Sequence, residues 1–294
     1  MIKYLKNKLR GFISNSIPIQ NIPQIQDNRY SPETKIALRN MYHYYQECAK
    51  KKEKINLSDT GFRIFSQFEE DGILLAIFGL IGEKNKTFVD IGGADGINSN
   101  CANLAINLGW NGLFIDGDQD NITKGSIFYK NHPDTWGYPP KLTKAFIQRE
   151  NINQIIEDAG FNGEIDLVSI DLDGNDYWIW DALKVVSPRV VIIETHIEFG
   201  FNSIVVPYDK DYFYPGKHPD YHGASPVAMN KLANKLGYRL VGSNNYGFNT
   251  IYIKNGIAED LLPEVSLDYI LRHPRNEERF KVFEPIKDWD YITV

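Results

Sequence analysis

The sequence predicts an α/β fold in which five parallel strands are followed by an antiparallel hairpin. From residue 62 onward, helical patterns alternate with short apolar segments that have the length of strands. These segments are continuously apolar rather than alternating, which is typical of parallel strands that helices cover on both faces. The last two predicted strands, residues 238–243 and 248–254, are separated only by a short turn. A parallel crossover needs about a dozen residues or more, so these two strands must be antiparallel neighbours.

The first half of the alternating region predicts two helices and two strands. An apolar helical pattern over residues 73–81 precedes a strand at residues 87–91, and the turn Gly92-Gly93-Ala94-Asp95-Gly96 follows it. The next helix carries apolar side chains at i, i+3, i+4 and i+7, which are Cys101, Leu104, Ala105 and Leu108. Gly109 then predicts a left-handed C-cap, and the second strand is expected at residues 112–116.

The second half predicts the remaining strands and a well-delimited helix. Residues 144–147, 165–170 and 190–194 are the other three candidates for parallel strands. Ser225 followed by Pro226 is a signal for the start of a helix, which should extend over residues 227–236 and end at Gly237.

Residues 1–60 differ from the rest of the chain and are predicted to form a helical N-terminal extension and linker. Apolar residues within residues 1–13 fall on one helical face beside basic ones, as in a membrane-surface anchor or in a short helix that packs on protein. We favour the packing helix, because one short basic helix is a weak membrane signal. Prolines 18, 23 and 32 mark a linker, and a helical pattern resumes over residues 32–52. The predicted units are therefore this extension (1–60), a main domain (61–255) and a C-terminal extension (256–294).

Composition argues against several classes of function. The chain of 294 residues has a formal net charge of −6, so it has no global basic surface for nucleic acid. Two cysteines cannot form a disulfide framework, which favours a reducing cytoplasm. No apolar run approaches the roughly eighteen residues of a membrane span, and no apolar segment of a secretory signal follows the basic start of the chain.

The glycine-rich turn after the first strand is the strongest single signal for a ligand. In Asp90-x-Gly92-x-Ala94-x-Gly96 the backbone can approach a ligand at the carboxyl end of a strand, although the motif is not the G-x-G-x-x-G of dinucleotide-binding proteins. The Asp90 carboxylate favours a ligand with an amino group and disfavours pyrophosphate. Asp116, about twenty residues after the glycines, is placed to accept hydrogen bonds from ribose hydroxyls. Together these residues predict an S-adenosylmethionine site; the alternative is a tight turn in which Asp90 caps the next helix.

Acidic residues also follow the fourth and fifth predicted strands. Asp171 and Asp173 would point the same way if both lay in a strand, and they could then share a hard cation. Glu194 and His196 are expected at the same edge of the sheet. Such a group either binds a metal or raises the pKa of one acid into the range of a general base. Asp176 is expected to cap the helix that follows.

A segment between residues 206 and 249 is rich in aromatic and histidine side chains: Tyr208, Tyr212, Phe213, Tyr214, His218, Tyr221 and His222. Loops of this composition at the active edge of a sheet suit a polar, flat acceptor such as a sugar. A lone histidine is more often structural than catalytic, so His218 and His222 are given no catalytic role.

At these residues the chain resembles the FkbM-like branch of class I S-adenosylmethionine-dependent methyltransferases, over about residues 65–254. The motifs that carry the resemblance are Phe65-Ser66-Gln67-x-x-Glu70-Asp71-Gly72-Ile73, Phe88-Val89-Asp90-Ile91-Gly92, Gly109-Trp110-x-Gly112-Leu113, Ile170-Asp171-x-Asp173-Gly174-Asn175-Asp176-Tyr177-Trp178, and Gly223-Ala224-Ser225 through Gly237-Tyr238. The resemblance implies a Rossmann-like seven-stranded sheet with a reversed last strand. It also implies methyl transfer to a hydroxyl, often on a sugar or a polyketide-type product. The second acid after strand four is usually Glu in that family, and Asp173 departs from this pattern.

The predicted cofactor-binding residues are Gln67, Asp71, Asp90, Gly92, Gly96, Asn98, Ser99, Asp116 and Asp171. Some related O-methyltransferases bind a divalent metal at the ends of strands four and five, and the resemblance places Mg²⁺ or Mn²⁺ at Asp171, Glu194 and His196. Asp173 or His196 is the expected proton acceptor.

The expected acceptor is a sugar or a nucleotide-activated sugar for a surface polysaccharide. The terminal extensions are where homo-oligomer contacts or acceptor specificity are expected. Two alternatives are a metal-dependent glycosyltransferase that uses Asp171-x-Asp173 and a non-catalytic methyltransferase-like scaffold that binds a partner protein.

Overall fold

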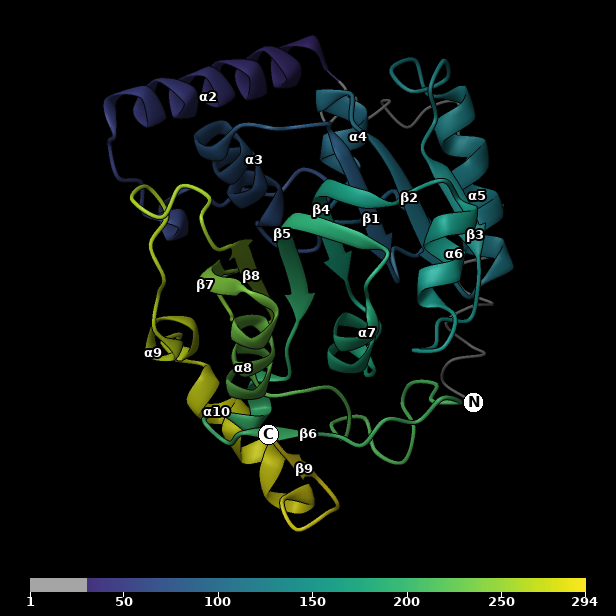
Figure 1. Cartoon of the computed structure of the whole chain (residues 1–294), viewed down its shortest axis with the longest axis vertical. Coiled ribbons are helices and arrows are strands. Elements are labelled where there is room, and N and C mark those ends of the chain that lie inside the picture. Colours follow the sequence, from purple (N-terminus) through teal and green to yellow (C-terminus); the bar gives the residue numbers. More distant parts are fainter. Residues whose placement is uncertain (1–30) are drawn as a thin grey trace, which may run out of the picture.

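A seven-stranded sheet in the order β3-β2-β1-β4-β5-β8-β7 lies at the centre of the structure, a computed structural model in which residues 31–294 are described (Figure 1). Its strands are β1 Thr87–Ile91, β2 Asn111–Asp116, β3 Lys141–Lys144, β4 Gly163–Ile170, β5 Val186–Glu194, β7 Tyr238–Ser243 and β8 Asn249–Lys254. Strands β1 to β5 are mutually parallel, and β8 runs antiparallel to both β5 and β7. This arrangement confirms the predicted α/β class, the five parallel strands with a hairpin, and the Rossmann-like sheet with one reversed strand. The amphipathic pattern of residues 1–13 and the first two linker prolines lie outside the described residues.

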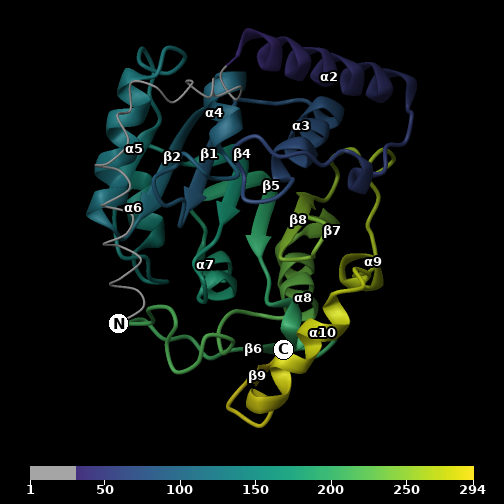
Figure 2. The same ribbon diagram turned by 180° about the vertical axis from the view of Figure 1, so that it is seen from behind.

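Helices cover both faces of this sheet, which explains why its strands are continuously apolar. The first face packs against α3 Glu70–Ile81, α4 Ala102–Leu108 and α5 Gln119–Asn131, and α2 Pro32–Lys51 packs on the outside of α3. The opposite face packs against α6 Ile152–Asp158, α7 Asp176–Ala182 and α8 Pro226–Leu236. Within β1, Phe88 belongs to the first layer of the core, and Val89 and Ile91 belong to the second. In Figures 1 and 2, α3 and α4 lie on one side of the strands, and α7 and α8 lie on the other.

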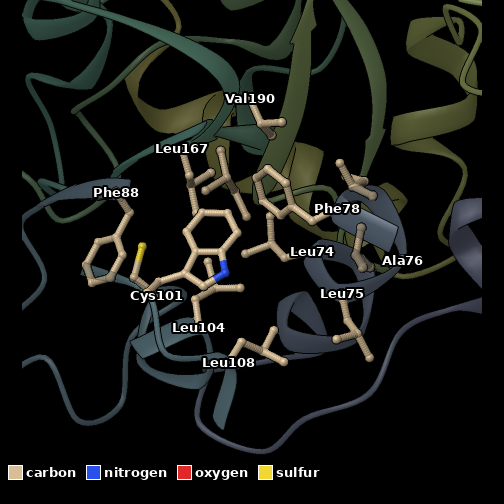
Figure 3. Packing of buried hydrophobic residues seen from close by; sticks show 14 of the residues in the cluster. Leu74, Leu75, Ala76, Phe78, Phe88, Cys101, Leu104, Leu108, Leu167 and Val190 are labelled. Atoms are coloured by element: carbon tan, nitrogen blue, oxygen red, sulfur yellow. The ribbon is translucent and has the colours of Figure 1, made fainter. Parts of the chain in front are cut away.

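Buried side chains between the sheet and helices α3 and α4 support the strand end that carries the glycine-rich turn. Figure 3 shows Leu74 and Phe78 of α3 and Leu104 of α4 converging on Leu167 and Val190 of the central strands, all of them buried. Each such side chain contributes about 1.5–3 kcal/mol of hydrophobic stabilisation when it is fully buried. The sheet edge that carries the predicted site is therefore supported by a rigid core.

The C-terminal extension folds against the end of the sheet where the parallel strands terminate. It contains α9 Leu267–Leu271, α10 Asn276–Phe280, the 3-10 helix η5 Lys281–Ile286 and strand β9 Ile292–Thr293. Strand β9 pairs antiparallel with β6 Ile204–Val205, so the end of the chain is joined to the segment that follows β5 (Figure 2). Among the described residues, no helix is both long and apolar enough to cross a membrane.

Most predicted element boundaries are close to the observed ones, but one strand was wrongly placed. Helix α8 begins after the N-cap Ser225, whose side chain accepts from the Ala228 amide, and ends at Gly237 with φ 85°, as predicted. The strand predicted at residues 144–147 lies instead at 141–144. The reason is that the apolar run continues past Lys144, the last residue paired with β2, into the wall of a cavity, where Phe146 is 49% exposed. The helix after the glycine-rich turn also begins late, at Ala102, because residues 97–101 form a non-helical loop.

Candidate functional site

Two adjoining cavities lie at the carboxyl ends of the parallel strands. The larger has a volume of about 840 Å³ and extends from the ends of β1 and β2 to the segment around Tyr212. The smaller, about 240 Å³, lies over the end of β1 and reaches Asn249 on β8. The two cavities share Gly92, Ala94, Asp171 and Asp173 in their walls. A single elongated ligand can therefore occupy both, with its middle beside these shared residues.

Asp90 forms an acidic floor in the smaller cavity. It occupies the fourth position of β1 and is 2% exposed, and its Oδ2 accepts a hydrogen bond of 2.7 Å from Ser99 Oγ. Burial raises the pKa of this carboxyl to about 6, against the opposing effect of the Ser99 hydrogen bond. The predicted residues Gln67, Asn98 and Ser99 line the same cavity. The local chemistry suits the charged amino-acid end of a ligand, because the acid and several amide groups face one small space.

Asp116 lies in the wall of the larger cavity, at the last position of β2. Its Oδ1 accepts hydrogen bonds from the Asp118 amide at 2.8 Å and from Asn121 Nδ2 at 3.2 Å. Both of these hydrogen bonds use Oδ1, so Oδ2 remains able to accept a hydrogen bond from a ligand. Phe146 and Tyr212 contribute aromatic surface to the same cavity. The combination of a fixed carboxylate and flat apolar walls suits a nucleoside.

Asp171, Asp173 and Glu194 form an acidic group where the cavities meet. One ligand oxygen from each of the three lies within 4.8 Å of the others. Desolvation raises the pKa of Asp171 well above its usual value, and the neighbouring acids Asp176 and Asp173 add to the effect. The pKa of Glu194 is raised in the same way, first by desolvation and then by Asp171. Such a group is stabilised by a cation or by a cationic ligand.

The predicted reason for the pairing of Asp171 and Asp173 was wrong, although the structure does bring them together. Strand β4 ends at Ile170, so neither residue lies in a strand. Asp173 instead has a φ of 52°, in the left-handed region that non-glycine residues seldom occupy. Strained backbone of this kind is concentrated at functional sites, where the surrounding structure maintains it.

Asp176 maintains that loop rather than capping its helix. It is the first residue of α7, whose N-cap is Asn175, so the predicted capping role was wrong. The Asp176 carboxylate accepts from the backbone amides of Leu172 at 2.8 Å and Gly174 at 3.0 Å. These two bonds fold the loop back on itself and hold Asp173 between them.

His196 does not join the acidic group. Its Nε2 lies 2.9 Å from the Asp220 carbonyl oxygen, which can only accept, so this nitrogen carries the proton. Burial lowers the pKa of His196 to about 4, and the imidazole is neutral at pH 7. Its Nδ1 lies 3.5 Å from the Glu198 carboxylate, and its ring lies 4.4 Å from that of His222. The structure therefore groups Asp173, not His196, with Asp171 and Glu194.

Two other predicted residues support the cavities without lining them. Asp71 is 1% exposed, and its Oδ2 accepts from the amides of Ile64, Phe65 and Ser66 at 2.6–2.9 Å. Asp71 thus fixes the loop that presents Gln67 to the smaller cavity. Gly96, with a φ of 70°, packs against the ring of Phe114, and its carbonyl oxygen accepts from the Tyr129 hydroxyl. Both residues shape the site from beneath.

Sequence reasoning missed several cavity residues because nothing local marks them. Asn100, Ser169 and Asn249 line the smaller cavity, and Gln119 and Asn121 line the larger. Asn249 opens β8 and reaches the site only because β8 lies beside β5. The order of the strands in the sheet, rather than the order in the chain, places it there.

Comparisons with known proteins give similarity at the level of structure. No protein-family model matches the chain, and no curated protein sequence matches it. An S-adenosylmethionine-dependent methyltransferase from Clostridium acetobutylicum has 10% identity and a TM-score of 0.40, over 74% of this chain and 99% of its own. An O-methyltransferase from Bacillus cereus, in complex with SAH, has 12% identity and a TM-score of 0.40, over 86% and 91%. A putative caffeoyl-CoA O-methyltransferase from Staphylococcus aureus has 13% identity and a TM-score of 0.41, over 76% and 99%. These similarities are too distant to assign a function, which must be argued from the site.

Proposed function

We propose that the protein is an S-adenosylmethionine-dependent O-methyltransferase of the FkbM-like type. The observation that carries this proposal is the pair of adjoining cavities, with Asp116 in the wall of the larger and Asp90 in the wall of the smaller. Asp116 faces the larger space, as a diol of ribose requires, and Asp90 faces the smaller space, as an ammonium group requires. A ligand with a nucleoside at one end and an amino acid at the other matches both positions.

In this assignment the chain's own residues bind the ligand in three parts. Asp116 accepts hydrogen bonds from the ribose hydroxyls, and Phe146 packs beside the base. Asp90 binds the ammonium group, and the side-chain amides of Gln67 and Asn98 donate to the carboxylate. Asp171, which lines both cavities, would border the sulfonium group, and that group would supply an activated methyl group. The negative charge of the acidic group favours a cationic centre at this place.

Transfer of the methyl group requires an aligned hydroxyl and an acceptor for its proton. The hydroxyl oxygen forms the new bond to the methyl carbon as the carbon–sulfur bond breaks, and the proton leaves to a base. We assign the base to Asp173, the most exposed member of the acidic group. His196 is the alternative base, because it is neutral at pH 7 with Nδ1 free of its proton.

The acidic group also fits a divalent cation such as Mg²⁺ or Mn²⁺. Carboxylate oxygens are the ligands that these hard ions prefer, and three of them converge here. A bound cation would lower the pKa of an acceptor hydroxyl and would keep the neighbouring acids ionised. Asp171, Asp173 and Glu194 are the residues that would hold it, and with Asp173 engaged in this way the proton would leave to the alternative base, His196.

The proposed acceptor is a sugar or a nucleotide-activated sugar. Exposed rings of Phe213 and Tyr214 also line the larger cavity, at 79% and 46% exposure. Aromatic faces at a polar opening suit the apolar face of a sugar ring, while its hydroxyls remain in water.

Binding of S-adenosylhomocysteine should be about tenfold weaker at pH 5 than at pH 7. Asp90, with a pKa of about 6, is ionised at pH 7 and attracts the ammonium group, but at pH 5 it must first lose a proton. Isothermal titration calorimetry at both pH values measures the change. 5′-Methylthioadenosine, which lacks the amino-acid end, serves as the control ligand and should show no such dependence.

The same titration discriminates between the alternatives. If neither ligand binds at either pH, the methyltransferase assignment is wrong. Binding of a nucleotide sugar with Mn²⁺ in that case would favour the glycosyltransferase, and binding of no small ligand would favour the scaffold. Equal pH dependence for both ligands would show that the ammonium group does not bind Asp90.

The Asp173→Asn variant should lose turnover by about 100-fold or more while it retains affinity for S-adenosylhomocysteine. A general base contributes about 10²–10⁴-fold, and the amide cannot accept the proton. Transfer of a radiolabelled methyl group to a panel of sugars and nucleotide sugars measures turnover. His196→Ala is made separately to test the second candidate, and full activity in both variants would rule out both bases.

A further inference from the structure

The side-chain amide of Asn249 has a fixed orientation. Its Nδ2 donates a hydrogen bond of 2.8 Å to Glu70 Oε1. A carboxylate oxygen only accepts, so the NH₂ group must face Glu70 and the Oδ1 oxygen must face the other way. Asn249 is 4% exposed, and its Oδ1 has no hydrogen-bond partner in the structure. A buried carbonyl oxygen without a hydrogen-bond partner is unfavourable, and a bound ligand would provide that partner.

Glu70 is built to hold this amide. It is fully buried, and its Oε1 also accepts from Asn244 Nδ2 at 2.9 Å. Its Oε2 accepts from the Phe68 amide at 3.0 Å. Asn244 differs from Asn249 in one respect: its Oδ1 is already satisfied, by the Gly247 amide at 2.9 Å. Of the two asparagines on Glu70, only Asn249 therefore presents a free acceptor.

The free oxygen lies beside the acidic group. Asn249 and Glu194 are directly paired residues of the antiparallel strands β8 and β5. Side chains of directly opposed residues lie on the same face of a sheet, with Cβ atoms about 4.5–5.5 Å apart. Asn249 also lines the smaller cavity together with Asp171 and Asp173. Asn249 thus borders the same space as the carboxylates of Asp171 and Asp173, and it lies beside Glu194 on the neighbouring strand.

We propose that Asn249 Oδ1 is a fourth oxygen ligand of a divalent cation bound by Asp171, Asp173 and Glu194, and that Glu70 is its positioning residue. Hard cations accept asparagine carbonyl oxygens together with carboxylates. A neutral ligand suits this group, because a fourth carboxylate would increase the repulsion between the acids. This inference rests on the cation part of the proposed function, but cation binding itself requires neither cofactor nor acceptor.

The test is a titration of the full chain with Mn²⁺, in which the electron paramagnetic resonance signal of free Mn²⁺ measures how much of the ion is bound. The wild-type protein should bind one Mn²⁺, and Asn249→Ala should bind it at least tenfold more weakly. Glu70→Gln should show a loss of about 10–100-fold, as expected when an outer partner no longer orients a ligand. Circular dichroism checks that each variant is folded.

Asn244→Ala is the matched control. This variant loses the hydrogen bond from Asn244 to Glu70, but the Asn244 Oδ1 that it removes already accepts from the Gly247 amide. Its Mn²⁺ affinity should therefore stay within about twofold of wild type. Equal losses in Asn244→Ala and Asn249→Ala would show a merely structural role and overturn the proposal. Unchanged affinity in Asn249→Ala, or no Mn²⁺ binding by the wild type, would also overturn it. S-adenosylhomocysteine binding without metal is measured in parallel, because it tests the methyltransferase proposal independently of the cation.

Discussion

Replacing Gly92 with alanine is expected to abolish measurable binding of S-adenosylhomocysteine. Gly92 has a φ of 87°, and a Cβ atom at this position would overlap the backbone carbonyl oxygen of Asp171. The left-handed conformation alone is unfavourable by about 1–2 kcal/mol for an alanine. To relieve the overlap, the backbone of residue 92 or of Asp171 must move, at the point where the two cavities meet. Calorimetry measures the binding, and thermal unfolding shows how much stability is lost.

Gly109→Ala is the matched control for this variant. Gly109 has a φ of 70° and ends α4, but a Cβ there would meet no atom within 4 Å, and the residue lines neither cavity. This variant should lose about 1 kcal/mol of stability and keep its affinity for the ligand. If Gly92→Ala binds as Gly109→Ala does, the turn can adjust and does not define the site.

Asp166→Ala is expected to reduce the free energy of unfolding by about 3–5 kcal/mol. Asp166 is fully buried in β4, where it accepts a hydrogen bond of 2.7 Å from Arg189 Nη1. It also accepts from the backbone amides of Lys84, Asn85 and Lys86 at 2.7–3.0 Å. Removing the carboxylate leaves a largely buried guanidinium and three amides without this partner. Urea denaturation, monitored by circular dichroism, measures the loss.

The neighbouring ion pair between Glu164 and Lys84 provides the comparison. Both of its side chains are exposed, at 40% and 64%, and exposed ion pairs contribute little to stability. Glu164→Ala should therefore unfold at nearly the same urea concentration as the wild type. A similar small change in Asp166→Ala would mean that water replaces the buried carboxylate at little cost.

The sequence by itself determined the α/β class, the order of most elements and the strand ends that carry Asp90 and Asp116. These features depend on local signals. Continuous apolar runs predict buried strands, and Gly109 and Gly237 end helices because a left-handed residue is needed there. Both aspartates were also correctly expected at the carboxyl ends of their strands, since that position follows from the length of the apolar run. The strand at residues 141–144 was misplaced because the apolar run continues past the last paired residue into the wall of a cavity, and an apolar pattern does not mark where strand pairing ends.

Only the tertiary structure decided which side chains share a space. Asp173 joins Asp171 and Glu194 because Asp176 bends the loop between them, and His196 is withdrawn by its bond to the Asp220 carbonyl. Asn249 reaches the acidic group because the hairpin returns β8 between β5 and β7. Such proximities depend on contacts between residues far apart in the chain, whose geometry is set by packing of the whole sheet and its loops. Periodicity and spacing record only the neighbours along the chain, so they cannot contain this information.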